Sequence, residues 1–218
     1  EIGLNSYKLH HYDEALNYYD LALKYSRDNE YRLIVLNNKA LAYREKKDYV
    51  SSVKIYNEII TKKKLSRKEY ARALTNLSFA KWLQNPTDKI GADLLTALYI
   101  RKKEKDLWGQ NSSYAHLVDY YSEANTDSAL FYARKRFVIS KQIDSPDDQL
   151  QALQKLIKLS PPDSTKQYFE TYEQLSDSVQ LARGAAKNQF ALIRYETEKH
   201  KADNLKLQQD NAEKKYQI

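Results

Sequence analysis

One pattern of small and aromatic residues recurs through much of the sequence. Its fullest copy runs from Asn37 to Ile60 and predicts two short helices joined by a tight turn. Apolar and small side chains of the second helix fall at helical spacing, at Tyr49, Ser52, Val53, Tyr56 and Ile59. Each helix has one apolar stripe that is too wide to leave in water and too small to form a core alone. We therefore expect this hairpin to pack against neighbours of its own kind.

Copies of the pattern lie on both sides of this hairpin, at steps of 37 to 39 residues. The upstream copy, at a step of 37, carries Gly3, Tyr12, Ala15, Tyr19 and Ala22. The next copy downstream, at a step of 38, carries Asn76, Ser78, Ile90, Leu94 and Ala97. A fourth copy, at a step of 39, places Tyr120 and Ala129 at the matching positions. A fixed recurrence of this kind predicts a stack of helical hairpins.

These positions resemble the tetratricopeptide repeat (TPR), in which a small residue lies in the middle of helix A, an aromatic residue follows, and a small, large, small trio lies along helix B. The upstream copy matches this pattern throughout. The steps exceed the usual TPR period of about 34 residues, which indicates longer turns. The third and fourth copies lack the aromatic residue, and the fourth has Arg136 where a small residue is expected. The resemblance implies an all-α fold, a right-handed α-solenoid of about five TPR-like hairpins followed by a long C-terminal helix.

Small residues at this spacing also have a direct physical reason. Helix B of one copy must approach helix A of its own copy and of the next, so small side chains are needed where the helix axes cross. The 19 Tyr residues suit such a surface, because their rings bury well while their hydroxyl groups reach solvent or a carbonyl. We interpret the tyrosine stripe as packing between helices rather than as a ligand cage.

Several residues mark where helices begin in the later part of the chain. Ser66 and Glu69 have the spacing of a capping box. Pro146 and Pro162 each follow a residue that ends a turn and suit the first position of a helix. These signals predict a third helix A after Ser66 and a fifth, degenerate hairpin with helices at about 147–159 and 163–183.

The chain is expected to divide into residues 1–160, a TPR-like repeat array, 161–184, the last helix B, and 185–218, a long polar helix. If the last helix continues through Gly184, it has about 55 residues and a length of about 80 Å. Five acidic residues and five lysines interleave between Glu196 and Lys215. Its apolar residues fall near heptad steps at Tyr195, Ala202, Leu205, Ala212 and Tyr216. We therefore predict that residues 185–218 promote a homodimer.

The tail also resembles the region that joins an extracytoplasmic TPR sensor to a transmembrane helix in Bacteroidetes-type signalling proteins. The similar residues are Asp177 and Ser178, the segment from Asn188 to Ala191 and the segment from Ile193 to Glu196. The resemblance implies the sensor part of a membrane-anchored regulator, outside the bacterial inner membrane, with a histidine kinase or a helix-turn-helix domain as output. The alternative is a cytoplasmic TPR scaffold without a membrane link.

The composition gives no support to catalysis, to a metal site or to a cofactor. The chain has no Cys, and its four histidines have no partner at metal-ligand spacing. Its four glycines are isolated, so no phosphate-binding loop is present in the sequence. No apolar run reaches the roughly 18 residues of a membrane span. We expect a non-catalytic domain that reaches a membrane only through segments outside this sequence.

The net charge of +7 raises the question of nucleic-acid binding. Its basic clusters begin at Lys62, Arg101 and Arg134, each near the expected end of a helix B. Cations at a helix C-terminus complement the helix dipole and stay solvated, which explains their recurrence without a ligand. We therefore expect no nucleic-acid partner for this segment.

Binding of a protein or peptide is the function that the resemblance implies, because stacked helices A line a concave groove in a TPR array. The family pattern places the following residues in this groove: Tyr7, Lys8, Asn37, Asn38, Leu41, Arg44, Arg72, Asn76, Phe79, Trp82, Tyr114 and Tyr121. Asn38 and Asn76 share one repeat position, where an amide can bond an extended peptide backbone. Arg44 or Arg72 can hold a carboxylate. The alternative is that each Asn ties down the main chain of a neighbouring helix.

Overall fold

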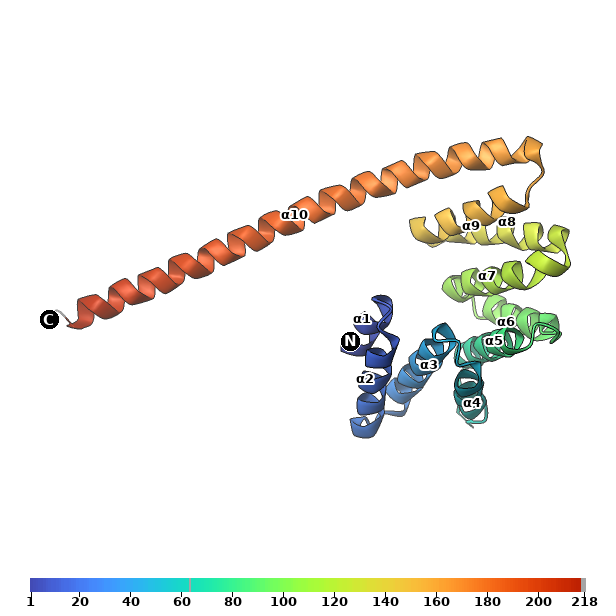
Figure 1. Cartoon of the computed structure of the whole chain (residues 1–218), viewed down its shortest axis with the longest axis horizontal. Helices are drawn as coiled ribbons and strands as arrows, with labels where there is room; N and C mark the ends of the chain where they lie inside the picture. Colours follow the sequence, from blue (N-terminus) through green and yellow to red (C-terminus); the bar gives the residue numbers. More distant parts are fainter. Residues whose placement is uncertain (63, 217–218) are drawn as a thin grey trace. The chain divides into compact units, whose positions relative to one another are not determined.

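The computed structural model describes residues 1–62 and 64–216, with side chains for all of these except 202, 203, 205 and 207–216. This part of the chain is all-α and contains ten helices, which follow one another as hairpins and end in a long C-terminal helix (Figure 1). In chain order they are α1 (Ile2–Lys8), α2 (Tyr12–Tyr25), α3 (Asn29–Glu45), α4 (Tyr49–Ile60), α5 (Arg67–Gln84), α6 (Gly91–Lys103), α7 (Leu107–Ala124), α8 (Thr126–Gln142), α9 (Pro146–Leu159) and α10 (Pro162–Tyr216). The predicted fold class, a TPR-like solenoid of consecutive hairpins, is confirmed.

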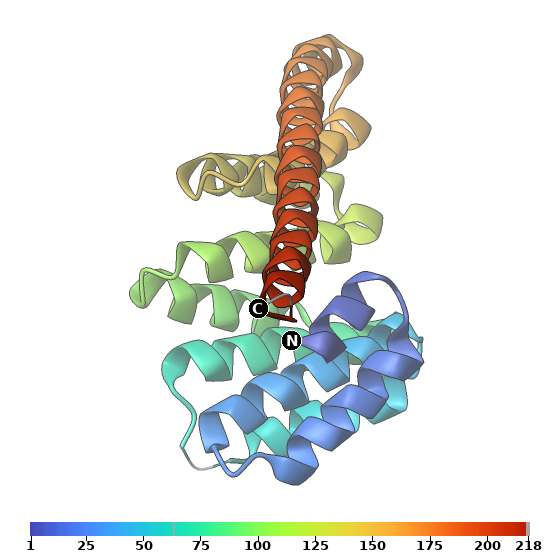
Figure 2. The ribbon, with the colours of Figure 1, turned by 90° about the vertical axis from the view of Figure 1, so that its left-hand side faces the viewer.

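The chain forms two compact units, Glu1–Lys166 and Gln167–Ile218. We call the first the repeat unit and the second the tail unit. Within the repeat unit each helix packs mainly on the helices before and after it in the sequence. Figure 1 and Figure 2 show α1 to α9 following one another in this order through the repeat unit. Its core is therefore a series of interfaces between neighbouring helices.

Polar side chains cap most helices of the repeat unit. Ser66 and Glu69 form the predicted capping box at the start of α5, since each side chain bonds the backbone N–H of the other residue. Asp48 accepts a hydrogen bond from the N–H of Ser51 at 3.0 Å, and Asp106 accepts one from Gly109 at 2.9 Å. These bonds satisfy N–H groups that have no partner inside the helix.

Small residues occupy the places where helices approach most closely, as the repeat pattern predicts. Ala15, Ala40 and Ser52 are completely buried. A Cβ atom added to Gly3 would lie 3.0 Å from a ring carbon of Tyr19, so this position has no room for a side chain without movement of the ring. Tyr56, the large residue of the second trio, has no exposed surface. Together these contacts let α1 approach α2 and let α3 approach α4.

Arg136 explains the departure of the fourth copy from the repeat pattern. Its side chain is buried, and its Nη2 donates to Asp148 Oδ1 at 3.0 Å and to Gln151 Oε1 at 2.8 Å. Both partners belong to α9, the next helix of the stack. A buried ion pair with a second hydrogen bond thus replaces the small residue at the interface between α8 and α9.

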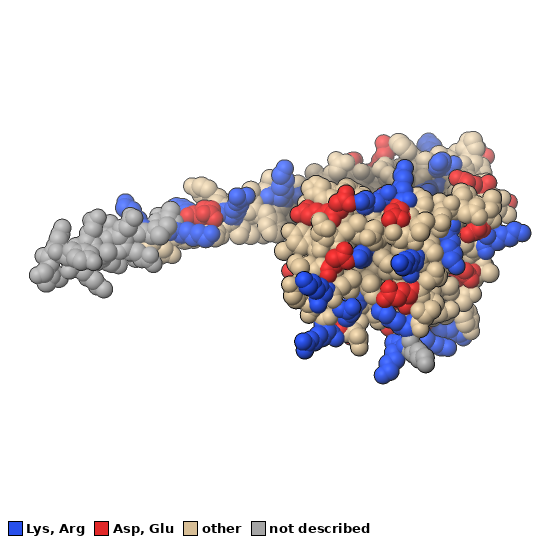
Figure 3. Space-filling view, turned by 60° about the horizontal axis from the view of Figure 1, so that its bottom comes forward, with Lys and Arg blue, Asp and Glu red and all other residues tan. Residues whose placement is uncertain are grey.

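The predicted position of one basic cluster is wrong. Arg134 and Lys135 lie in the middle of α8 rather than near its end, and they are exposed. Arg101, Lys102 and Lys103 do form the last turn of α6, where cations complement the helix dipole. Figure 3 shows Lys and Arg interspersed with Asp and Glu on the face that it displays.

The tail unit belongs to one continuous helix. α10 passes through Gly184 without a break and has 55 residues. From Gln180 onward, every residue whose side chain the structure describes is exposed. No helix among the described residues combines the length and the apolar character that crossing a bilayer requires.

Candidate functional site

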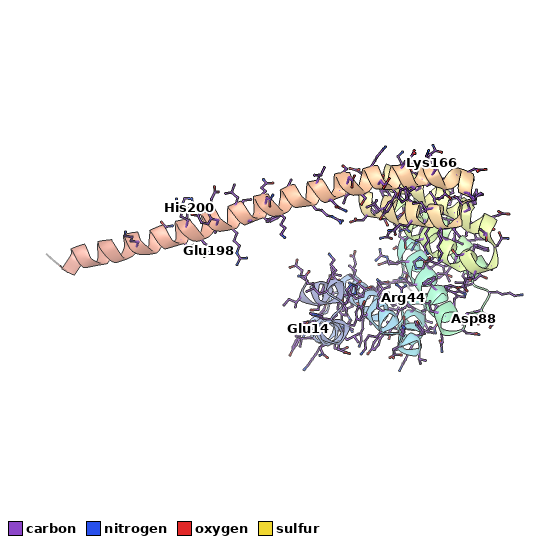
Figure 4. The ribbon with its side chains drawn as sticks, turned by 45° about the horizontal axis from the view of Figure 1, so that its top comes forward. Glu14, Arg44, Asp88, Lys166, Glu198 and His200 are labelled. Atoms are coloured by element: carbon purple, nitrogen blue, oxygen red, sulfur yellow. The ribbon has the colours of Figure 1, made fainter. Side chains whose placement is uncertain are left out.

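One hollow of the repeat unit collects residues from the first helices of four successive hairpins. It has a volume of about 400 Å³, within the usual range for ligand pockets. We call it the groove. Its lining residues come from α1, α3, α5, α6, the turn before α7, and α7, and they are Tyr7, Asn37, Leu41, Arg44, Lys68, Arg72, Asn76, Arg101, Asp106, Trp108, Gly109, Ser112 and His116. Figure 4 labels Arg44, which α3 contributes.

A chain of side-chain amides connects α3 and α5 beneath the groove. Asn76 Nδ2 donates to Asn37 Oδ1 at 3.1 Å, and Asn37 Nδ2 lies 3.4 Å from Asn38 Oδ1. The hydroxyl group of Tyr56 lies 3.4 Å from the main-chain carbonyl of Asn37. The amide of Asn76 therefore bonds a side chain of the neighbouring helix, and the amide of Asn37 has a partner at both its oxygen and its nitrogen.

Arg44 is held between a carboxylate and an aromatic ring. Its side chain is 15% exposed, and Nη2 donates to Glu45 Oε1 at 2.9 Å. The guanidinium carbon lies 5.6 Å from the centre of the Phe79 ring, within the range of a cation–π contact. Its Nη1 is buried and has no hydrogen-bond partner among the described residues. This nitrogen is an unsatisfied donor inside the wall of the groove.

Arg101 contributes a second buried guanidinium group. The residue is 3% exposed, and Nη1 donates to the carbonyl of Gly109 at 2.6 Å and to Ser113 Oγ at 2.8 Å. Burial lowers the pKa of Arg101 to about 10, with the charge of Asp106 acting in the opposite direction, so the side chain remains protonated at pH 7. Its Nε has no partner within the described part of the chain.

His116 of α7 offers an acceptor to the groove. Its Nδ1 lies 2.8 Å from the carbonyl of Ser112, so Nδ1 carries the proton and Nε2 is the acceptor of the neutral ring. Burial lowers the pKa of His116 to about 4, which keeps the ring neutral at pH 7. The ring meets Phe79 edge to face, with 4.4 Å between the ring centres. Trp108, which is 62% exposed, lines the same wall.

Positive charge dominates the lining. Four of its side chains are cationic, at Arg44, Lys68, Arg72 and Arg101, and only Asp106 is acidic. Asp106 is already engaged as the cap of α7. Positive charges converge here from α3, α5 and α6, which would attract an anionic group.

Six of the twelve residues predicted for the groove line it: Tyr7, Asn37, Leu41, Arg44, Arg72 and Asn76. Phe79 lies behind them, against Arg44 and His116. Lys8 and Asn38 are exposed and half-buried respectively and are not part of the lining. Trp82 packs on Phe79, with 5.3 Å between ring centres.

The two predicted tyrosines of α7 lie elsewhere. Tyr114 is 4% exposed and belongs to a core cluster with Leu94 and Leu117. Tyr121 stacks on Tyr132 of α8, with 5.7 Å between ring centres. Both tyrosines therefore serve the packing between helices.

Sequence reasoning missed seven lining residues: Lys68, Arg101, Asp106, Trp108, Gly109, Ser112 and His116. Most of them come from the start of α7 and the turn before it, where the repeat pattern is weakest. One signal did exist. Lys68 lies four residues, about one helical turn, before Arg72 and therefore shares its face of α5.

No catalytic or metal-binding arrangement accompanies the groove. Among the described residues, no group of three or more His, Cys, Asp or Glu side chains is placed to hold a metal ion. The lining carries no nucleophile beside a base, because Ser112 offers only its carbonyl to His116.

Comparison with known proteins identifies the fold. No sequence profile of a known family matches the chain, and neither does any curated protein sequence. The crystal structure of a Rap protein complexed with Competence and Sporulation Factor is similar to 80% of this chain and 52% of that chain, with 17% identity and a TM-score of 0.71. The crystal structure of BtubC from P. vanneervenii is similar to 85% of this chain and 78% of that one, with 17% identity and a TM-score of 0.58.

The protein is thus a TPR-like all-helical repeat protein. The chain spans about half the length of the Rap protein that it resembles. At 17% identity the likeness concerns the fold, so the role of the groove has to be argued from its own residues.

Proposed function

We propose that the repeat unit binds a peptide in the groove and holds an anionic group of that peptide with its arginines. The observation that carries the proposal is the convergence of Arg44, Arg72 and Arg101 from three helices on one hollow of about 400 Å³. Buried guanidinium groups are costly unless their donors are paired. A carboxylate supplies two acceptor oxygens to such donors and forms strong charge-assisted hydrogen bonds.

The remaining polar groups of the groove suit a peptide backbone. Asn37 and Asn76 bond one another, but an amide has two donor and two acceptor positions, so each retains capacity for a further hydrogen bond. His116 offers an acceptor, Nε2. Leu41, Tyr7 and Trp108 provide apolar surface beside them. The similar Rap structure contains a bound factor, which supports a binding role for this kind of fold. The amide groups and apolar surface beside the arginines favour a peptide over a small inorganic anion.

The proposal is tested with a displayed library of random decapeptides that carry free C-termini. Peptides enriched on the 1–218 chain are resynthesised with free or amidated C-termini, and with each Asp or Glu replaced by its amide, to identify which carboxylate is held. Arg72→Ala should weaken binding by about 10- to 100-fold, because a hydrogen bond to a charged group contributes about 1.5–3 kcal/mol.

Arg134→Ala is the matched control, because Arg134 is an exposed arginine of α8 that does not line the groove. It should bind like the unmodified chain. Circular dichroism establishes that both variants fold. The proposal is overturned if no peptide is enriched, or if Arg72→Ala and Arg134→Ala bind the enriched peptides equally well.

We further propose that the repeat unit is the sensor part of a membrane-anchored regulator on the extracytoplasmic side of a bacterial inner membrane. The support is the resemblance of the segment from Asp177 to Glu196 to the linker of such proteins, together with a helix long enough to pass a signal onward. A cytoplasmic scaffold is the alternative. The gene's flanking sequence distinguishes them, since the sensor requires a signal peptide upstream and an apolar stretch of about 20 residues downstream.

A further inference from the structure

Several large apolar side chains of α10 are exposed in the tail unit. Phe190 is 75% exposed, Ile193 51% and Tyr195 68%. Figure 4 shows this part of α10 as a single helix, with Glu198 and His200 labelled on it. A polar helix of this length is not stable on its own sequence propensity and needs a partner surface. The question is which face is covered and by what.

Phe190 and Ile193 begin one face with heptad spacing. If Phe190 is assigned to position a, then Ile193 occupies d, and the next positions of the face are Thr197 (a), His200 (d) and Asn204 (a). All of these residues are exposed. We call this face the Phe190 seam. It has two large apolar residues at its start and polar residues at the next three positions, so these positions contribute more to the choice of partner than to the strength of association.

The charges beside the Phe190 seam complement those of a second copy of the helix. Glu196 lies at position g and Lys201 at position e. In a parallel, in-register dimer, position g of one helix faces the e position five residues later on its partner, so Glu196 meets Lys201 of the other copy. Lys201 also lies 3.1 Å from Glu198 of its own helix, but both side chains are about two-thirds exposed, so that pair contributes little. The sequence continues the pattern, with acidic residues 7 and 14 positions beyond Glu196 and a lysine 14 positions beyond Lys201.

The competing face of the helix contains Tyr195, and it would place like charges opposite one another in a parallel homodimer. In its register, Arg194 lies at position g and faces Lys199 at position e of a parallel partner. Lys201 likewise faces Lys206. These like charges would repel one another in a homodimer. Charge complementarity therefore selects the Phe190 seam over the stripe of Tyr195, Ala202 and Leu205 that the heptad count alone favours.

We propose that two copies of this protein associate through the Phe190 seam as a parallel, in-register coiled coil. The polar residue Asn204 at position a agrees with this arrangement, because a buried Asn pairs with its counterpart only when two parallel helices are in register. The partner is a second copy, since the g and e charges of one helix match those of an identical one.

Cysteine cross-linking tests the register, and the chain is suited to it because it has no native Cys. Phe190→Cys and Asn204→Cys, each in the 1–218 chain, should form disulfide-linked dimers under mild oxidation. Equivalent a positions of a parallel coiled coil lie within disulfide reach. Tyr195→Cys is the control and should cross-link several times more slowly. Efficient cross-linking at both positions 190 and 204 excludes an antiparallel dimer, which brings only one such position to its centre.

A charge exchange provides the second measurement. Glu196→Lys and Lys201→Glu should each reduce the dimer fraction in sedimentation equilibrium, and the double variant should restore it. Lys199→Glu should leave the dimer unchanged, whereas it would strengthen a dimer built on the Tyr195 face. The proposal is overturned if the chain is monomeric at all concentrations, if Tyr195→Cys cross-links fastest, or if the double variant fails to recover.

Discussion

His116 is a groove residue whose pKa is shifted within the pH range where stability is readily measured. Burial lowers its pKa to about 4 in the folded protein, against about 6.5 in an unfolded chain. Between these values the unfolded state binds more protons, so the free energy of unfolding increases with pH. The contribution is complete above about pH 6.5 and is lost as the pH falls towards 4.

We predict that lowering the pH from 7.5 to 5 costs the repeat unit stability on the order of 1–2 kcal/mol through this residue. Urea denaturation followed by tryptophan fluorescence measures it. His116→Gln should flatten the profile in this window, while His200→Gln, which changes an exposed residue of the tail unit, should leave it unaltered. If the free energy of unfolding depended on pH equally in His116→Gln and in the unmodified chain, His116 would not be the source of the effect.

The asparagines show how far residue-level prediction extends. The repeat step of 38 pairs Asn38 with Asn76, but the hydrogen bond in the structure joins Asn76 to Asn37. Sequence alignment identifies equivalent positions within each helix, whereas contact across helices depends on how each helix is rotated about its axis. Arg101 illustrates the same limit. It belongs to a basic run at the end of α6, and only the packing of Gly109 and Ser113 against it reveals its burial.

At the scale of single helices, local signals predicted the starts of α5, α9 and α10 well. Ser66, Pro146 and Pro162 act through bonds or dihedral angles within a few residues, so their effect can be predicted without tertiary contacts. The start of α6 has no such local signal, because no side chain caps it. α6 begins at Gly91, after a turn in which Asn85 Nδ2 donates to Asp88 Oδ1 at 2.7 Å.

The capping box of α5 connects helix stability to the groove, because α5 carries Lys68, Arg72 and Asn76. We predict that Ser66→Ala lowers the free energy of unfolding by about 1 kcal/mol. The hydroxyl and the N–H of Ser66 also lower the pKa of Glu69, so this pKa should rise in the variant.

Urea denaturation gives the stability change, and an NMR pH titration of Glu69 gives the pKa. Thr96→Ala is the control, because Thr96 is an exposed hydroxyl residue in the interior of α6 that bonds its own helix at 2.9 Å. It should change stability by less than about 0.5 kcal/mol. If both substitutions lowered the free energy of unfolding equally, the capping box would contribute no more than an ordinary hydrogen bond within a helix.

At the scale of the whole repeat unit, the order of helices in the sequence is also their order in the stack. This is why the fold could be predicted from the sequence. A recurrence of 37 to 39 residues defines each hairpin, and each hairpin needs only its neighbours. The groove was harder to predict, because it depends on side chains that four hairpins bring together, including those at the weakly patterned start of α7.

The same organisation predicts that damage to one interface spreads only to adjacent helices. Leu153 of α9 is completely buried, and Leu153→Ala should cost about 2–5 kcal/mol locally. Because stability in a stacked array is a sum of neighbouring interfaces, α8 and α9 should lose protection from amide hydrogen exchange while α2 to α4 retain it. Leu36→Ala, at a buried position of α3, should produce the reverse distribution. Hydrogen exchange measured by mass spectrometry, peptide by peptide, resolves the two patterns. A uniform loss of protection across α2 to α9 in both variants would show instead that the repeat unit unfolds as a single cooperative body.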